Sequence, residues 1–349
     1  MTLDLNAPRP ITEPRAGLAL LLACALWGIS FSVMKTLNMA PRVVDPGIDG
    51  WFVSSLMVVL RFLLAGAVLL ALRPGTPSRG ELLQGVALGA VTGLGMLLQT
   101  DGLSYTEAST SAFLTQGYVV LLPIVGFVLT RRAPSARVVA CALLVLVGLA
   151  VLARFDPRRL ALGRGELQTL AAAACFTVQI LLLDVPRFRG HRASPVTTTM
   201  FLSIGLLLLP VVFHTARSVH DVELAVAARG SFVMLVAIVA LPTLCSFSLM
   251  NRFQRQVTPS EAGIIYASEP VFASTLALFL PSLLSRLAHV DYANERLDSR
   301  LLIGGGLVVV ANVILALSAD RQRTAAASVS RRGSRSPAKP RPHSPGGSQ

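Results

Sequence analysis

Long apolar segments separated by short polar ones follow one another along most of the chain. A bilayer core about 30 Å thick is crossed by a helix of about 20 apolar residues, and ten segments approach that length. We therefore predict an all-α integral membrane protein with ten transmembrane helices. The predicted spans cover about residues 16–34, 52–72, 83–100, 109–130, 138–153, 166–185, 196–213, 232–250, 262–280 and 301–318.

The segments outside these spans are short and polar. Residues 1–15 form a proline-bearing lead, and residues 319–349 form a basic tail rich in Arg, Ser and Pro. Neither composition can bury a core, so we predict that both are disordered. Residues 216–230 are compatible with a short surface helix. Residues 282–300 carry Leu283, Leu284, Leu287 and Val290 at a spacing that suits a helix lying flat at the membrane interface.

Two segments, beginning at Thr106 and Thr258, are similar at a distance of 152 residues. They divide the chain into two halves of five spans, residues 16–153 and 166–318. An odd number of spans inserts the second half upside down, which is the inverted repeat that many transporters use for alternating access. The alternative is that any two leucine-rich helices align by chance.

Gly85, Gly89 and Gly93 lie four residues apart on one face of the third span. Small residues at this spacing let another helix approach closely. Packing within the chain is the first interpretation and homodimerisation the second, so both a monomer and a homodimer remain open.

The composition supports the membrane prediction. The 349 residues are 53% hydrophobic and 14% charged, with a mean hydropathy of +0.65, whereas soluble domains are about a quarter charged. The net charge of +13 comes from Lys and Arg between spans and in the tail, so it is a topology signal and does not indicate nucleic acid. The two sides nearly tie, and only the tail places both termini in the cytoplasm of a cell membrane. That tail predicts contact with anionic lipid head groups.

The motifs of several other classes are missing from the sequence. There is no GxxxxGK phosphate loop, no HExxH pair and no recognisable Ser/His/Asp set, so we expect no ATP motor, no metal site, no cofactor and no catalytic residue. Cys24, Cys141, Cys175 and Cys245 lie in apolar segments without metal-ligand spacing, and a disulfide framework is not indicated.

Glu269 and Pro270 lie in the middle of the ninth span. A carboxylate in hydrocarbon costs roughly 2.5 to 3.5 kcal/mol on insertion scales, so it usually faces a bundle interior or a wet cavity. The proline removes a backbone donor and frees carbonyls that can line a binding site. Glu269 is thus a candidate for binding a proton or a substrate, and the alternative is a structural bond to the broken backbone.

Arg61, in the second span, is the basic counterpart of Glu269. Its burial can be offset by a carboxylate, a helix C-terminus or an anionic substrate, or it can reach the surface. Other candidates for the cavity could equally serve in packing or hydrogen bonding between helices. They are the polar residues Gln99, Gln116, Gln179, Asn251 and Tyr266, and the aromatic residues Trp27, Tyr118 and Phe176.

Several motifs resemble the EamA-type transporters of the drug/metabolite transporter superfamily. They are Trp27-Gly28, Arg61-Phe62, LSYTEASTSAFL entering span four, TPSEAGIIYASEPVFASTLALFL in span nine, and Glu295-Arg296-Leu297 before LLIGGGLVVVANVIL. The resemblance covers residues 16–318 as two EamA-like repeats. In the first repeat Gly117-Tyr118 stands at the Glu-Pro position, Thr130-Arg131-Arg132 replaces an expected acidic residue, and the loop before Glu295 is longer.

The resemblance implies a secondary-active transporter that exports a small metabolite, amino-acid-like or otherwise polar or amphipathic, by alternating access. Its partners would be that small molecule and the lipid bilayer. An importer or exchanger is the alternative within transport. From other classes, an integral membrane enzyme acting on lipid-linked substrates and a non-transporting sensor or scaffold stay open.

Overall fold

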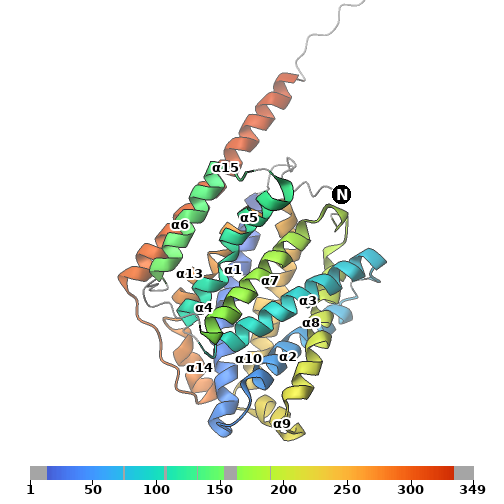
Figure 1. Ribbon diagram of the computed structural model, residues 1–349, viewed down its shortest axis with the longest axis vertical. Coiled ribbons are helices and arrows are strands. Elements are labelled where there is room, and N and C mark those ends of the chain that lie inside the picture. Colours follow the sequence, from blue (N-terminus) through green and yellow to red (C-terminus); the bar gives the residue numbers. More distant parts are fainter. Residues whose placement is uncertain are drawn as a thin grey trace, which may run out of the picture.

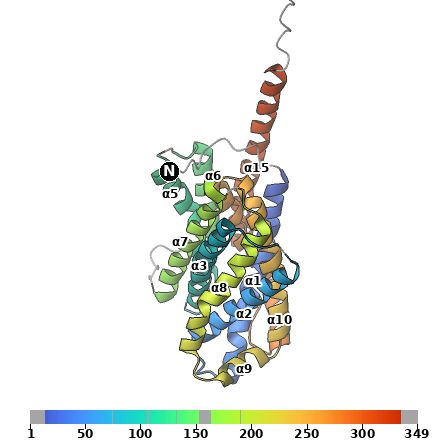
Figure 2. The ribbon, with the colours of Figure 1, turned by 90° about the vertical axis from the view of Figure 1, so that its right-hand side faces the viewer.

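The computed structural model describes residues 14–73, 75–105, 108–131, 133–152, 163–188 and 190–333, which form a bundle of helices (Figures 1 and 2). Within these residues there is no strand. The α-helices are α1 (Pro14–Val44), α2 (Gly50–Ala71), α3 (Arg79–Gly102), α4 (Ala108–Thr115), α5 (Tyr118–Thr130), α6 (Ala136–Leu152), α7 (Arg164–Asp184), α8 (Ala193–Thr215), α9 (Val219–Ala227), α10 (Ser231–Ile238), α11 (Ser246–Phe253), α12 (Pro259–Tyr266), α13 (Glu269–Leu276), α14 (Leu280–Ala288) and α15 (Ser299–Gly333). Two short 3-10 helices, η1 (Pro186–Phe188) and η3 (Gln254–Gln256), and one π-helix, η2 (Val239–Cys245), complete the set.

Six helical segments in the described residues are long and apolar enough to cross a membrane: α1, α2, α3, α7, α8 and the continuous segment Ser231–Gln256. A seventh would be Pro259–Leu276 with Leu280–Ala288, a pair bent by 65°. Three shorter apolar helices are Phe113–Leu129, Ala136–Val151 and Ser299–Leu315. The all-helical membrane class is therefore confirmed. Each predicted span overlaps one of these helices, but the count of ten crossings stays a prediction.

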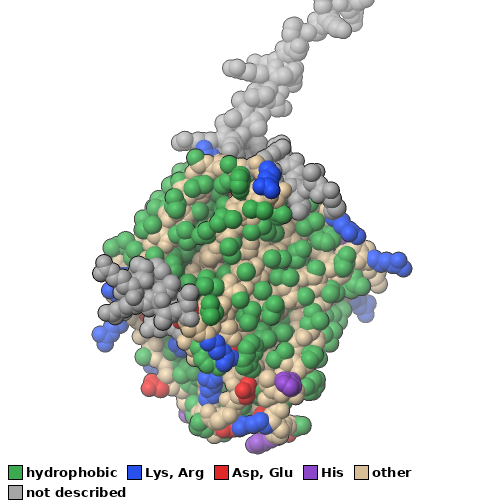
Figure 3. Space-filling model, in the orientation of Figure 1, with side chains coloured by type: hydrophobic (Ala, Val, Ile, Leu, Met, Phe, Trp, Pro, Cys, Tyr) green, Lys and Arg blue, Asp and Glu red, His purple; other side chains and the backbone are tan. Residues whose placement is uncertain are grey.

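The surface fits this class. Hydrophobic side chains cover most of the middle of the face in Figure 3, and charged side chains lie mainly at its lower end and margins. Exposed leucines and valines are common on α6 and α15, for example Leu143, Val147 and Val309. In a soluble protein such a surface would aggregate, whereas lipid tails solvate it.

Some segments differ from the sequence prediction. The first helix continues past Pro41 to Val44, because Leu37 and Ala40 of the same turns are buried in the core and offset the lost hydrogen bond. Helix α15 continues to Gly333, into the segment where we expected no regular structure, and the run of Ala and Arg there has high helix propensity. Residues 1–13 and 334–349 lie outside the described residues, so the predicted disorder of the lead and of the end of the tail is not addressed.

The centre of the bundle is the contact between α2 and α8. The rings of Phe62 and Phe201 meet edge to face with centroids 5.4 Å apart. A Cβ added to Gly66 would lie 2.7 Å from Leu202, and one added to Gly205 would lie 2.4 Å from Leu63. Each helix therefore inserts a leucine opposite a glycine of the other, three residues along. This reciprocal packing is what a local twofold relation between α2 and α8 produces.

Helix α3 packs on α8 through its small residues. A Cβ at Gly85 would lie 2.5 Å from Thr199 Cβ, one at Gly89 would lie 2.5 Å from Ser203 Cβ, and Gly93 is in ordinary contact with Ile204. The glycine face thus packs within the chain, as the first interpretation predicted. This close approach brings the two predicted halves together along α3 from Gly85 to Gly93.

Candidate functional site

A cavity of about 90 Å³ lies among α1, α2, α3, α7, α11 and the two broken helices α4–α5 and α12–α13. Both predicted halves contribute to its wall. The lining residues are Trp27, Ser30, Phe31, Met34, Arg61, Met96, Gln99, Thr100, Leu103, Thr115, Tyr118, Phe176, Gln179, Ile180, Phe247, Met250, Tyr266 and Glu269.

Eight of the eleven residues predicted for the site line this cavity, namely Trp27, Arg61, Gln99, Tyr118, Phe176, Gln179, Tyr266 and Glu269. Gln116 is fully buried beside Glu269. Asn251 is also fully buried, and its amide donates to Thr197 Oγ1 at 2.8 Å, so it serves as the hydrogen bond between helices that we named as the alternative. Pro270 is buried in the first turn of α13 and does not line the cavity.

Arg61 is almost completely buried, at 2% exposure, yet its partners are neutral. Its Nε donates to Thr243 Oγ1 at 2.6 Å, Nη1 to Ser30 Oγ at 3.1 Å, and Nη2 to the Pro242 carbonyl at 3.4 Å. Among the described residues no carboxylate is hydrogen-bonded to Arg61, although Glu269, which also lines the cavity, interacts with it electrostatically. The burial of Arg61 is therefore offset by backbone and hydroxyl oxygens.

The partner segment of Arg61 is the π-helix η2. Pro242 within it has no N–H, and Thr243 Oγ1 donates to the Ile238 carbonyl at 2.6 Å. A π-turn leaves carbonyls and side chains aimed away from the regular ladder, and such turns are frequent at functional sites. Arg61 therefore joins α2 to the one irregular turn of the α10–η2–α11 segment.

Glu269 opens α13, directly after a break at Ala267–Ser268 that separates α13 from α12. A carboxylate in the first turn of a helix interacts favourably with the helix dipole. The side chain is partly exposed, and it faces the cavity. Pro270 occupies an early position where its missing N–H is no loss, so the break precedes the proline and does not follow from it.

The carbonyls freed by this break have side-chain partners. Asn312 of α15 donates to the Ile264 carbonyl at 3.3 Å and to Ser268 Oγ at 3.0 Å, and the Cys24 thiol of α1 donates to the Ile265 carbonyl at 3.5 Å. The structural role that we considered for Glu269 is thus filled by Asn312 and Cys24. The carboxylate itself is left facing the cavity.

Aromatic rings form a large part of the wall. The Trp27 ring meets Phe247 at 5.4 Å and Tyr266 at 5.5 Å between centroids, both edge to face. The Tyr266 hydroxyl donates to Gln254 Oε1 at 2.8 Å. Trp27 Nε1 is buried and has no hydrogen-bond partner among the described residues, so it is available to an acceptor on a bound molecule.

The lining repeats along the sequence. Trp27, Ser30 and Phe31 of α1 recur 149 positions later as Phe176, Gln179 and Ile180 of α7. The other wall helices repeat at 151 positions: Met96 with Phe247, Gln99 with Met250, Thr115 with Tyr266, and Tyr118 with Glu269. The helix break at Gln116–Gly117 likewise recurs at Ala267–Ser268. The repeat is thus one residue shorter here than the 152 of our alignment.

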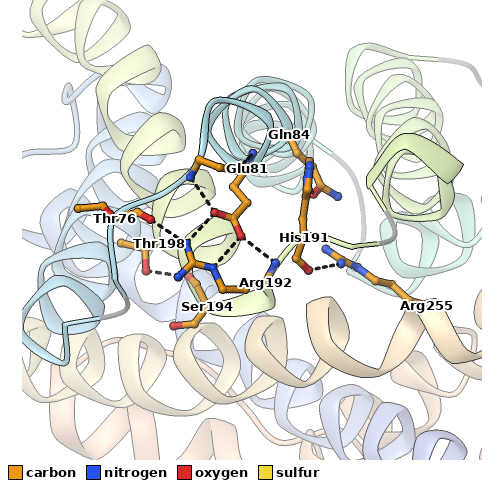
Figure 4. Close-up of polar contacts among 9 residues, drawn as sticks. Thr76, Glu81, Gln84, His191, Arg192, Ser194, Thr198 and Arg255 are labelled. Atoms are coloured by element: carbon orange, nitrogen blue, oxygen red, sulfur yellow. Dashed lines mark hydrogen bonds and ion pairs between the residues drawn. The ribbon is translucent and has the colours of Figure 1, made fainter.

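A polar cluster that we call the latch lies at the start of α3, outside the cavity lining: Glu81, Gln84, His191, Arg192 and Arg255 (Figure 4). Arg192 donates from Nε to Glu81 Oε1 and from Nη2 to Glu81 Oε2, both at 2.9 Å. His191 Nδ1 lies 2.9 Å from Gln84 Oε1, and Arg255 Nη1 donates to the His191 carbonyl at 2.7 Å. The bond to Glu81 raises the pKa of Arg192. The latch thus ties the start of α3 to the loop before α8.

Gln254 links the latch to the cavity wall. It is the neighbour of Arg255 in the chain, accepts from Tyr266, and donates to the carbonyl of Ile180 at 2.9 Å. On the opposite side the lining extends to Thr100 and to Leu103, the residue that follows α3. The cavity therefore reaches toward the end of α3 that lies away from the latch.

The far end of the molecule carries other ion pairs. Arg217 Nη2 lies 2.5 Å from Asp45 Oδ2 and 3.0 Å from Asp221 Oδ1, and these hydrogen bonds lower the pKa of both carboxyls. Asp101 accepts from Arg164 at 2.8 Å and from Gln168 at 2.9 Å. Within the described residues, no group of three His, Cys, Asp or Glu side chains could hold a metal ion.

Comparison with known proteins adds three findings. Residues 15–154 match the profile of the EamA-like transporter family. An uncharacterized transporter of Archaeoglobus fulgidus is 25% identical over 308 residues, which is 86% of each chain. A solved structure, titled only as the crystal structure of a protein, superposes with a TM-score of 0.64 at 17% identity and covers 89% of this chain and 99% of its own. This last likeness concerns the fold alone.

Proposed function

We propose that the chain is a secondary-active transporter that moves a small polar or amphipathic metabolite by alternating access, since residues 15–154 match the EamA-like transporter family and a relative over 86% of the chain is a transporter. The observation that carries this proposal is the cavity wall, whose residues recur at 149 to 151 positions in the two halves. A site between two repeats is where inverted-repeat transporters bind their solutes.

The proposed architecture is ten crossings in two inverted repeats of five, with residues 16–153 and 166–318 as the halves. The reciprocal Leu63–Gly205 and Leu202–Gly66 packing supports an axis between α2 and α8. The shorter helices α5, α6 and α15 would complete the crossings. In this arrangement the latch would hold one end closed, and the cavity, whose lining reaches Leu103, would open toward the other end.

For orientation we propose that both termini face the cytoplasm of a plasma or inner membrane, which places the latch on the cytoplasmic side. Export is the direction that the family resemblance implies. The solute would then enter when the latch opens and leave toward the side of Arg217. Separation of the start of α3 from the loop before α8 would be the opening movement.

The test uses purified chain in liposomes loaded with a mixture of small metabolites extracted from cells. We expect selected solutes to leave these liposomes faster than they leave protein-free liposomes, as measured by mass spectrometry of the retained contents. A chemically altered product with no selective release would favour a membrane enzyme instead. Neither release nor conversion would favour a sensor or scaffold and would overturn the proposal.

A further inference from the structure

Two charged side chains line the described cavity, Arg61 and Glu269. They differ in how accessible they are to a solute in the cavity. Arg61 is 2% exposed, and each of its three nitrogens already donates to a neutral oxygen. Three of its five N–H groups are used in this way, and the other two belong to a side chain that is almost fully buried, so Arg61 is the less accessible of the two charges.

Glu269 is in the opposite situation. Its side chain is partly exposed in the cavity, and it forms no ion pair within the described residues. Its neighbour Gln116 is neutral. Arg61 interacts electrostatically with this carboxylate, but it is almost fully buried, so the more accessible of the two charges in the cavity is negative. In a low-dielectric cavity one accessible charge is a strong determinant of which ions bind.

The hydrogen-bonding groups point the same way. Gln99 uses its Nε2 to donate to Thr115 Oγ1 at 3.0 Å, and Gln179 directs its Nε2 to Met250 Sδ at 3.5 Å. Both amides therefore keep their carbonyl oxygens as free acceptors. With the Glu269 carboxylate they form a set that suits a donor-rich group such as an ammonium.

The aromatic wall also suits a cation. Trp27, Tyr266, Phe176 and Phe247 all line the cavity within reach of the same solute. The faces of such rings attract cations, and aromatic cages recognise ammonium groups in this way. The same rings would bury the apolar body of the molecule.

We propose that the transported solute is an organic cation, an amphipathic amine whose ammonium binds Glu269 and whose body packs on the aromatic wall. This inference rests on the proposed transport function and adds the charge class of its substrate. Arg61 has a positioning role here, because it holds the π-helix η2 and does not contact the solute.

The experiment compares four compounds with one phenylethyl body: phenethylamine, phenylalanine, 3-phenylpropionate and 2-phenylethanol. Trp27 and Trp51 are the only tryptophans of the chain, so a Trp51→Phe protein reports binding through Trp27 fluorescence in detergent. We expect saturable binding of phenethylamine and at least roughly tenfold weaker binding of the zwitterion, the anion and the alcohol, since tenfold corresponds to one modest charge interaction.

Glu269→Gln should weaken phenethylamine binding by about the same factor. The matched control is Glu261→Gln, because Glu261 belongs to the capping box of α12 and glutamine serves equally well there. Unchanged amine binding in Glu269→Gln, tighter binding of phenylalanine or 3-phenylpropionate, or no amine binding at all would each overturn the inference. Selective release of anionic solutes from the metabolite-loaded liposomes would do so as well, while leaving the transport function intact.

Discussion

Arg61 is a buried cation of α2 whose three nitrogens donate hydrogen bonds to Ser30 of α1 and to Thr243 and Pro242 of the π-helix η2. Buried charges are usually paired with a carboxylate, but a ring of neutral acceptors can also satisfy a guanidinium. Such an arrangement fixes geometry more than it binds ligands. The residue that the sequence suggested as a substrate contact is therefore better understood as a support for an irregular turn.

Arg61→Lys tests this role. A lysine keeps the charge but cannot donate along three fixed directions, so we expect a loss of roughly 1 to 3 kcal/mol of stability. Thermal unfolding in detergent measures it. The affinity for phenethylamine should stay within about threefold, a change smaller than one tenfold step, while the maximal transport rate falls. A large loss of affinity at unchanged stability would show that Arg61 contacts the solute.

Arg217 supports a different prediction, on pH. Its hydrogen bonds lower the pKa of Asp45 and Asp221, and a lowered carboxyl pKa contributes stability above its ordinary value of about 4, which is lost as the pH falls through the folded-state value. Arg217→Gln should therefore lower the melting temperature by roughly 1 to 2 °C at neutral pH. The difference from the native chain should shrink below about pH 4.

The control for this series is Arg229→Gln, because Arg229 is an exposed arginine of the same loop region. Its melting temperature should follow that of the native chain at every pH. A deficit of Arg217→Gln that persists unchanged in acid would mean that the carboxyls are not the source of the effect.

At the scale of the elements, the contact of α3 with α8 decides how rigidly the halves are held. An added Cβ at Gly89 would lie 2.5 Å from Ser203 Cβ and 2.8 Å from the Met200 carbonyl. Because backbone atoms border this contact, the helices would have to separate.

Gly89→Ala should therefore destabilise the chain by about 1 to 3 kcal/mol, the usual cost of overpacking. The matched control is Gly306→Ala in α15, where nothing lies within 4 Å of the added methyl. There the change should be neutral, or stabilising by up to about 1 kcal/mol through helix propensity. Thermal unfolding of the two variants side by side checks this, and equal melting temperatures would contradict the close packing.

The elements also show which features the sequence could predict. The apolar runs predicted all the long helices, since hydrocarbon requires them, and Glu269 and Arg61 were found because charges are rare in such runs. The π-helix was not predicted, although Pro242 inside the apolar run was a local signal for an interrupted hydrogen-bond ladder. The helical continuation past Pro41 depends on burial that no local signal reveals.

The cavity was only partly predictable for a similar reason. Polar residues within apolar spans can be recognised as cavity candidates from the sequence. Met34, Met96 and Met250 also line the cavity wall, but in the sequence they are indistinguishable from lipid-facing or core residues. Asn251 and Gln116 looked like cavity residues and are buried within the packing. The internal repeat was the signal that could have identified the other cavity residues. A shift of 151 positions pairs Gln99 with Met250 and Thr115 with Tyr266.

At the scale of the whole molecule, the inverted repeat requires that each half crosses the membrane an odd number of times. Helix α6 is short for a crossing, because its 17 residues rise only about 25 Å against a core of about 30 Å. Ser135 and Gly163 flank this helix and are exposed, so a cysteine introduced at either position can be labelled from solution.

In a background without native cysteines, an impermeant maleimide should label Ser135→Cys from the same side as Thr76→Cys. It should label Gly163→Cys from the same side as His220→Cys. The reference positions are exposed and lie at the latch end and the Arg217 end of the molecule. Labelling of both α6 flanks from one side would leave four crossings in the first half and remove the inversion.

Alternating access further requires that the latch is a contact of one state only. Glu81 is 4% exposed and bonded to Arg192 in two places, so losing Arg192 removes charge-assisted bonds that exist only while that end is closed. In cysteine-free protein carrying Met250→Cys, a residue of the cavity wall, Arg192→Gln should raise maleimide labelling from the latch side roughly fivefold, as a small bias on a two-state equilibrium does. Arg187→Gln alters an exposed arginine of the same loop and should leave labelling unchanged. If Arg192→Gln raised labelling from both sides together, it would have loosened the fold instead of opening one end, and the latch would be a structural tie that both states share.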